Sequence, residues 1–377
     1  MIVFLSKYAY IYSKKTNSNM QIEKNNYPEL IENKFEFKIT KGQKPIRLDT
    51  FLTNSIHNAS RNKVQLSIDA GNVLVNGQMK KASYKISPAD EITCIVMQMP
   101  PIELIPEDIP IDIVYEDEHL LVLNKNAGMC VHPGVGNRYG TLINALLFYF
   151  GHRENITFNV EDLDDSEINF SNHFQNTETL NNNIRPGLVH RIDKNTSGLL
   201  VIAKRQDVHN NLSNQFANKT TEREYYAIVW GKPKFEYTKI EANIGRSSKD
   251  RTSFAVLYKE GKPAITECWV SERFLYTSLL KFKLLTGRTH QIRVHSGSIG
   301  HKLFGDERYG GNNIINGKEN PQWRSIAAKL LSTYPRQMLH AKTLGFMHPI
   351  TQKRMLFTSD LPADMLSVID AMRHFSL

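Results

Sequence analysis

The residues of this chain best suited to chemistry lie in residues 185–204, which read RPGLVHRIDKNTSGLLVIAK. One carboxylate, Asp193, follows two protonatable or cationic side chains, His190 and Arg191, and precedes a Thr-Ser-Gly turn and an apolar run typical of a buried strand. An arginine beside an aspartate favours the anionic carboxylate, so Asp193 is predicted to act as a nucleophile or base rather than a proton donor. The alternative reading of these residues alone is that Asp193 caps a turn and pairs with Arg191.

A second dense group of polar side chains lies in residues 284–295, which read LLTGRTHQIRVH. Arg288, His290, Arg293 and His295 place four basic or protonatable groups within eight positions. A metal site is disfavoured, because these histidines show no helical i, i+4 spacing and have no acidic or thiol partner nearby. The sequence also lacks a dinucleotide-binding fingerprint and a phosphate-binding loop, so we predict neither a metal nor another cofactor.

Three segments together resemble one enzyme family. Residues 185–200 resemble the signature of RluA-type pseudouridine synthases, R-P-G-[IL]-V-H-R-L-D-x-x-T-S-G-L-L, with Ile192 and Asn195 as departures that leave the acid, the arginine and the turn intact. Residues 222–231, EREYYAIVWG, resemble the family's R-x-Y-x-A motif, and residues 287–295 resemble its third motif, G-R-T-H-Q-I-R-V-H. Residues 125–128 and 337–349 also resemble family motifs, and together with the N-terminal unit described below the matched motifs span nearly all of residues 45–350.

The resemblance implies a role for each motif residue. Asp193 would be the catalytic residue, and Arg293 would lie against it and keep it ionised. Tyr225, which on its own reads as a core strand residue, would stack on the target base and assist the late proton removal. Arg191 would fill the stack that the extruded uridine vacates, while His190 and Arg288 would contact RNA. Whether Asp193 attacks as a nucleophile or assists glycal formation is left open by the sequence.

Residues 45–96 predict a separate small unit with two amphipathic helices followed by short strands around an Asn-Gly turn. The order RLDxFL, SRxxxQxxIxxGxVxVNG and a late DEI resembles the S4 RNA-binding domain. The resemblance implies that Arg47, Arg61 and Lys63 contact RNA phosphates, which gives affinity and salt dependence rather than sequence choice. The alternative for such charges is a solvated face.

The remaining segments complete the expected organisation. Residues 1–40 read as a poorly ordered tail, with either Met1 or Met20 as the true start, and the proline-rich residues 97–110 read as a linker. The catalytic domain would then occupy residues 111–377, with insertions near residues 153–183 and 312–334. Thr141 and Asp207 are expected to cap helices, residues 245–254 to form a basic loop, and residues 337–349 to form a closing helix and strand.

Composition narrows the classes of protein further. The 377 residues carry a formal charge of +9 and a pI near 9.2, which favours a polyanionic partner. No window has the roughly 20 uninterrupted apolar residues of a membrane span, so no membrane association is expected. Three scattered cysteines fit a reducing compartment, and we expect a cytoplasmic monomer.

We therefore predict an α+β fold, with a small S4 RNA-binding domain joined to a pseudouridine synthase catalytic domain on a mixed, largely antiparallel central sheet. The predicted activity is isomerisation of specific uridines in 23S rRNA or a pre-ribosomal large subunit, with structured RNA as the partner. A tRNA-modifying synthase and a non-catalytic RNA-binding protein are the alternatives. A glycoside hydrolase is a distant third, because it needs two carboxylates and the motifs place only one.

Overall fold

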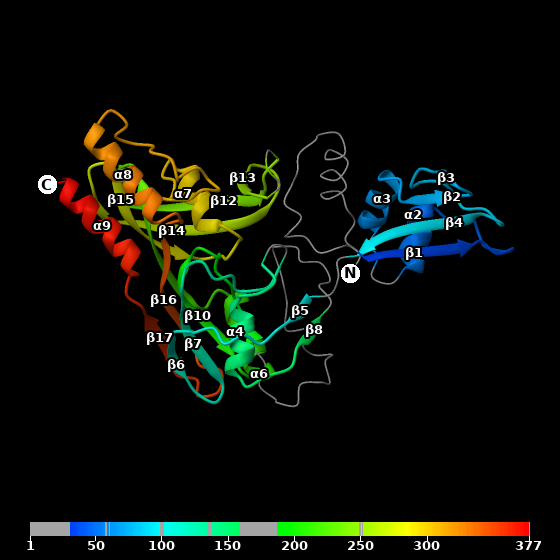
Figure 1. Ribbon diagram of the computed structural model, residues 1–377, viewed down its shortest axis with the longest axis horizontal. Coiled ribbons are helices and arrows are strands. Elements are labelled where there is room, and N and C mark those ends of the chain that lie inside the picture. The colour runs from blue at the N-terminus through cyan, green and yellow to red at the C-terminus, as the bar shows by residue number, and fades with distance from the viewer. Residues whose placement is uncertain are drawn as a thin grey trace. The chain divides into compact units, whose positions relative to one another are not determined.

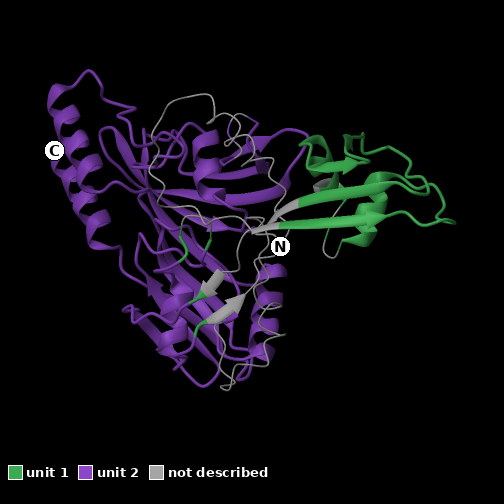
Figure 2. Ribbon diagram, turned by 45° about the vertical axis from the view of Figure 1, so that its right-hand side comes forward, with its two compact units in different colours: residues 1–104, 134–138, 155–164 green, residues 105–133, 139–154, 165–377 purple. Residues whose placement is uncertain are grey.

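The computed structural model describes residues 31–56, 59, 61–98, 102–134, 137–158, 187–248, 250 and 252–376. Internal contacts divide the chain into two compact units, shown in Figure 2: residues 1–104 with 134–138 and 155–164, and the remainder. Most of the insertion expected near residues 153–183 lies outside the described residues, as do the possible start sites Met1 and Met20.

The first unit is built on a four-stranded antiparallel sheet in the order β1-β4-β2-β3, accompanied by two short helices (Figure 1). Asn76 and Gly77 both have positive φ angles, 51° and 71°, as a tight hairpin turn between β2 and β3 requires. The elements are β1 (Ile31–Lys38), α2 (Leu48–Ser55), α3 (Arg61–Asp69), β2 (Val73–Val75), β3 (Gln78–Met79) and β4 (Glu91–Gln98).

The first unit begins earlier than the sequence suggested. The expected tail, residues 1–40, is wrong for its last part, because β1 pairs along its whole length with β4. Phe35 and Phe37 pack against the core of the unit, and the alternating pattern FEF that carries them is typical of a half-buried strand. The expected linker is also more structured: β4 continues to Gln98, and β5 (Ile102–Leu104) pairs with β8 (Ile156–Phe158).

The second unit is organised by an eleven-stranded sheet with the order β13-β12-β14-β15-β11-β16-β10-β7-β6, with β17 paired to β16 and β9 to β10. Its one parallel contact joins β10 and β16, and the other pairs are antiparallel, which confirms the expected mixed sheet. The strands are β6 (Ile113–Glu116), β7 (Leu120–Lys125), β9 (Gly187–Leu188), β10 (Ser197–Ala203), β11 (Glu222–Trp230), β12 (Tyr237–Arg246), β13 (Phe254–Leu257), β14 (Lys262–Arg273), β15 (Thr277–Leu284), β16 (Leu339–Met347) and β17 (Arg354–Thr358).

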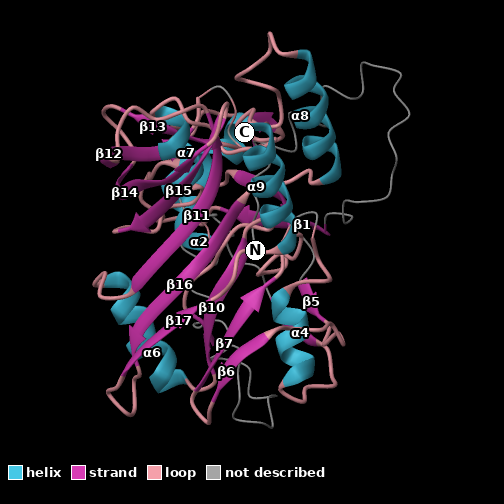
Figure 3. Cartoon of the chain, turned by 90° about the vertical axis from the view of Figure 1, so that its left-hand side faces the viewer, coloured by secondary structure: helices cyan, strands magenta, loops and turns pink. Residues whose placement is uncertain are grey.

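Helices cover different parts of this sheet (Figure 3). Helix α6 packs Val208 and Leu212 onto β7, β10 and β16, and α7 packs Val294 onto β12 and β14. As expected, α4 is buried over most of its length after Thr141. The helices are α4 (Leu142–Tyr149), α6 (Gln206–Ala217), α7 (Gln291–Ser298), α8 (Pro321–Thr333) and α9 (Ala363–Ser376). None of the described helices has the length and apolar character needed to cross a bilayer.

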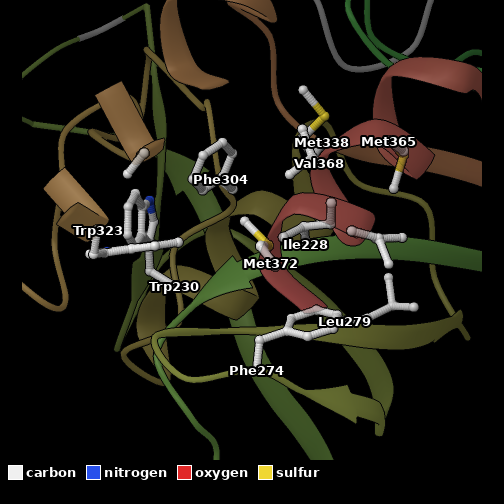
Figure 4. Packing of buried hydrophobic residues seen from close by; sticks show 12 residues of the cluster. Ile228, Trp230, Phe274, Leu279, Phe304, Trp323, Met338, Met365, Val368 and Met372 are labelled. Atoms are coloured by element: carbon white, nitrogen blue, oxygen red, sulfur yellow. The ribbon is translucent and has the colours of Figure 1, made fainter. Parts of the chain in front are cut away.

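The insertion expected near residues 312–334 is instead partly core. Trp323 of α8 is buried beside Trp230 of β11, with ring centroids 6.2 Å apart, and Met365 and Met372 of α9 complete the cluster (Figure 4). The sequence did hold a signal for this packing, because the buried residues of α8, Trp323 and Ala327, are four positions apart, as on one face of a helix. The polar residues next to them obscured this spacing.

Two further expectations differ from the structure. Residues 339–347 form a single strand rather than a helix and a strand, because β16 is sandwiched between β10 and β11. Asp207 lies in the first turn of α6, and Arg205 occupies the N-cap position.

Candidate active site

Asp193 lies in the loop between β9 and β10, and backbone contacts fix this loop from two sides. The buried Lys125 ammonium donates to the carbonyl oxygens of Asn126, Met129 and Lys194, at 2.7, 2.8 and 3.0 Å. Arg336 donates to the Asn195 carbonyl oxygen at 3.1 Å. The residues on the C-terminal side of Asp193 are therefore tied to the ends of β7 and β16, which fixes the position of the carboxylate.

Gly198 lets the loop enter the sheet. Its φ is +119°, and a Cβ atom there would lie 2.2 Å from the Ala341 carbonyl oxygen of β16. Only glycine accepts both the backbone angle and this approach. The Ser-Gly pair of the turn after Asp193 therefore places the start of β10 directly against β16.

One buried arginine joins two carboxylates at the centre of the site. Arg293 of α7 donates from Nη1 to Asp193 at 2.8 Å, and from Nε and Nη2 to Asp306 at 2.7 and 2.8 Å. The Arg293 side chain is 7% exposed and the Asp306 side chain 1% exposed. Bidentate pairing with Asp306 orients the guanidinium so that its remaining edge faces Asp193. Among the described residues, Asp193 forms its ion pair with Arg293 and lies close to the His290 ring, rather than pairing with Arg191.

His290 gives Asp193 a second neighbour. Its Nε2 atom lies 3.8 Å from the carboxylate, and its Nδ1 atom lies 2.8 Å from the Tyr309 hydroxyl. The residue has a φ of +55°, a left-handed conformation that a non-glycine residue adopts at a cost and that turns the chain into α7. Tyr309 in turn stacks its ring under the Arg293 guanidinium, 5.0 Å away.

These contacts decide the charge of the site. Burial works to raise the pKa of Asp193, but the charge that His290 carries when it is protonated, the Arg293 charge and the hydrogen bond from Arg293 outweigh burial and hold that pKa below its ordinary value. Burial, with the Arg293 and Arg308 charges, lowers the pKa of His290 to about 4 despite the opposing effect of Asp193. At neutral pH His290 is therefore uncharged, and Arg293 supplies the positive charge that keeps Asp193 anionic.

Tyr225 and Asp193 line the same cavity, which has a volume of about 490 Å³. Tyr225 is 7% exposed, and its pKa is raised mainly by burial. No hydrogen bond joins its hydroxyl to another described residue, so the ring and the hydroxyl are both available to a guest in the cavity. The size and the aromatic wall suit a flat heterocycle.

Arg191, His190 and Arg288 also line this cavity, as the sequence predicted for a shared site. Arg191 is exposed and also lines a second cavity of about 300 Å³, which shares Asp193 with the first. Arg288 is half-buried and donates to the Pro263 carbonyl oxygen at 3.2 Å. His190 accepts a hydrogen bond from the Val201 N–H and stacks on a ring of α6, and burial with the nearby Arg223 charge lowers its pKa to about 3, so it faces the cavity uncharged.

The other predicted contacts lie in the first unit. Arg47 donates to both oxygens of the buried Asp49, at 3.0 and 2.9 Å, and Arg61 donates to the same carboxylate at 3.2 Å. Their side chains remain 42% and 57% exposed. Lys63 lies in α3, and its side chain falls outside the described part of the structure.

Comparison with known proteins agrees with this geometry. The model of the RNA pseudouridylate synthase family matches residues 119–298, and that of the S4 domain matches residues 46–92. An uncharacterized RNA pseudouridine synthase of Chlorobaculum parvum is 44% identical over 341 residues, which cover 89% of this chain and 96% of the relative. The chain belongs to the RNA pseudouridylate synthase family.

Two further relatives of the synthase cover it to a similar extent. An uncharacterized RNA pseudouridine synthase of Bacillus subtilis is 38% identical, covering 90% of this chain and 99% of its own. A protein named ribosomal large subunit pseudouridine synthase D, from Zymomonas mobilis, is 38% identical and covers 85% of this chain and 91% of its own. The protein is therefore an RNA pseudouridine synthase with an S4 domain.

Sequence reasoning missed Asp306 as a site residue of the synthase. Asp306 lies outside the motifs quoted above, and the match of the synthase family ends before it. A signal was present, since a buried arginine has five N–H donors and one aspartate cannot accept them all. Asp306 also bears on the glycoside hydrolase alternative: both of its oxygens are bound by Arg293, so this second carboxylate is not a free proton donor.

Proposed function

We propose that the synthase converts specific uridines of large-subunit rRNA to pseudouridine, with Asp193 as the catalytic nucleophile or base. The observation that carries the proposal is the 2.8 Å contact between Arg293 and Asp193 at the edge of the cavity that Tyr225 also lines. An anionic carboxylate, a buried cation and an aromatic wall meet there, and the described part of the cavity lining holds no second free acid.

The isomerisation needs few protein groups beyond this carboxylate, this cation and this aromatic side chain. The bond between C1′ of the ribose and N1 of uracil breaks, the base turns, and C1′ bonds to C5, which then loses its proton while N1 gains one. No electrons are exchanged with a donor, so the isomerisation needs no cofactor. Asp193 would act at the ribose or the base, Arg293 would stabilise its anion where water is largely excluded, and Tyr225 would stack on the uracil and assist the late proton removal.

The choice of rRNA rests on relatives and on the first unit. Relatives from Zymomonas mobilis and Nitrosomonas europaea carry the name ribosomal large subunit pseudouridine synthase D. The S4 match supplies a second RNA-binding element, with Arg47, Arg61 and Lys63 as proposed phosphate contacts. Extruding a uridine from structured RNA costs a few kcal/mol, which such contacts would help to offset.

Around the cavity, Arg191 is the proposed occupant of the vacated base stack, because it is exposed at the border of both cavities. Arg288 would bind phosphate, and His190 would contact RNA through an uncharged ring. We further infer that the synthase acts as a monomer in the cytoplasm, on free 23S rRNA or a pre-ribosomal particle.

Tritium release from 5-tritiated uridine tests the proposal, with transcribed 23S rRNA and total tRNA as separate substrates. We expect release from 23S rRNA and background release from tRNA. Release from tRNA alone would replace rRNA by the tRNA alternative. If neither RNA nor pre-ribosomal particles release tritium while RNA binding persists, the protein binds RNA without modifying it.

A further inference from the structure

Arg223 lies on the same strand face as Tyr225, two residues before it on β11. Both side chains line the cavity of about 490 Å³. Arg223 is 8% exposed, so its guanidinium is almost entirely removed from bulk water. The activity described above gives it no role.

Within the described residues, Arg223 makes no ion pair, and its Nε atom is buried without a hydrogen-bond partner. Its guanidinium carbon lies over the ring of Phe216, 5.4 Å from the ring centroid. The two other buried arginines near Asp193 are both paired: Arg293 is bound by two carboxylates and Arg336 by Asp364. A buried cation without an anion is destabilising, which makes an external anion the natural partner.

The surroundings of Arg223 fit an anion. Lys219, Arg288 and Arg191 line the same cavity, whereas Asp193 is the one carboxylate among the described residues that line it. Gly287 lies beside the guanidinium, and a Cβ atom there would take up space 3.1 Å from Arg223 Nη1 that glycine leaves open. Gly287 itself is exposed, so this approach to Arg223 begins at the surface.

We propose that Arg223 binds a phosphodiester of the RNA, either that of the target nucleotide or that of its immediate neighbour, in the cavity lined by Tyr225 and Asp193. The contact holds the backbone of the extruded nucleotide while Tyr225 holds its base. The proposal rests on the RNA synthase activity but not on rRNA as the substrate.

The test compares the full-length protein with Arg223→Met, which keeps the length of the side chain and removes its charge. Without ligand, the variant should melt at the same temperature as the wild type or higher, because an unpaired buried charge is lost. Inorganic phosphate should raise the melting temperature of the wild type but not that of Arg223→Met. RNA affinity should fall about tenfold, and the slope of log affinity against log salt should decrease by about 0.7–0.9, the value for one phosphate.

Gly287→Ala tests the same contact without removing the charge. Its methyl group narrows the approach to Nη1, so RNA affinity should fall by a smaller factor than in Arg223→Met. Arg373→Met is the charge-matched control, since Arg373 pairs with Glu272 on the surface and does not line the cavity. It should leave the salt slope and the phosphate effect unchanged.

A lower melting temperature of Arg223→Met, together with an unchanged salt slope, would overturn the proposal and make Arg223 a structural residue. An equal phosphate effect in wild type and variant would also overturn it. These readouts use phosphate and any bound RNA, so they hold whether or not 23S rRNA is the substrate. Absence of tritium release from 23S rRNA would overturn only the proposed function.

Discussion

The two units of the protein contain the same kinds of charged groups in opposite ratios. In the second unit, one arginine, Arg293, is shared by two carboxylates, Asp193 and Asp306. In the first unit, one carboxylate, Asp49, is shared by two arginines, Arg47 and Arg61. The three side chains of the second unit together carry a net negative charge, and Arg293 and Asp306 are buried. Those of the first unit carry a net positive charge, and both arginines are exposed.

The difference teaches how one type of ion pair serves two tasks. A carboxylate that must react needs a cation that holds it ionised without occupying both of its oxygens, and Arg293 binds one oxygen of Asp193 while Asp306 fixes the rest of the guanidinium. Cations that bind phosphate need orientation and free N–H groups. Asp49 accepts hydrogen bonds from Arg47, Arg61 and Gln65. These bonds fix the two guanidinium groups in place, while their remaining N–H groups face solvent.

The largest expected effect is that of Asp193→Asn. The amide keeps the size of the side chain but removes the anion, so the single-turnover rate of pseudouridine formation should fall by about 10³-fold or more. RNA affinity, measured by filter binding in the same samples, should stay within about threefold. A rate near that of the wild type would exclude Asp193 as the reacting group.

Asp306→Asn should have the next largest effect. It removes one charge-assisted partner of Arg293, a contact of about 1.5–3 kcal/mol, which corresponds to about a 10–100-fold loss of rate if the orientation of Arg293 is what is lost. RNA affinity should be unchanged, because Asp306 is buried behind Arg293. An equal loss in affinity and rate would show that Asp306 supports the fold of the cavity rather than the charge of Asp193.

In the first unit, Asp49→Asn should weaken RNA binding by about three- to tenfold by releasing two arginines from fixed positions.

The same variant should change the response to acid. Hydrogen bonds from Arg47, opposed by burial and aided by Gln65 and Arg61, hold the pKa of Asp49 far below its usual value. Since the pKa is lowered in the folded state, the stabilisation is present above the unfolded pKa of about 4 and is lost as the pH falls below it. Acid unfolding followed by circular dichroism should therefore show a smaller pH dependence in the variant.

The smallest expected effect is that of Arg61→Gln. The side chain is more than half exposed, so its loss should reduce RNA affinity about two- to fivefold and the salt slope by roughly one phosphate, with no measurable change in rate once RNA is bound. Titrations at several salt concentrations measure this. An unchanged salt slope would mean that Arg61 only pairs with Asp49 and does not contact an RNA phosphate.

The sequence was enough to predict much of this arrangement, for identifiable reasons. The motif around Asp193, the strand carrying Tyr225 and the Arg293 segment are local patterns, and the structure brings all three to adjoining cavities. The mixed sheet was also predicted from the resemblance. The pairing of Arg293 with Asp193, across 100 positions of the chain, was expected from the family resemblance and not from a local pattern. The second carboxylate that Arg293 binds, Asp306, was not expected.

The errors have the same physical origin. The strand at residues 31–38 was taken for tail because its pairing with β4 depends on residues 91–98. Helix α8 was taken for an insertion because the burial of Trp323 depends on Trp230 and on α9. Arg223 is the arginine of the R-x-Y-x-A motif, but it was given no role of its own, because an arginine in a strand gives no sign of whether an acid will reach it.

The pH dependence of the single-turnover rate tests the central claim most directly, that Arg293 keeps Asp193 anionic in a buried site. Activity that requires the Asp193 anion is lost only as the pH falls through its lowered pKa, below the usual value of about 4. The rate should therefore be flat from pH 7 to pH 5, with RNA saturating. An acid limb with an apparent pKa of about 6 that is absent from RNA binding would contradict the account, because it would mean that burial, and not Arg293, controls the charge of Asp193.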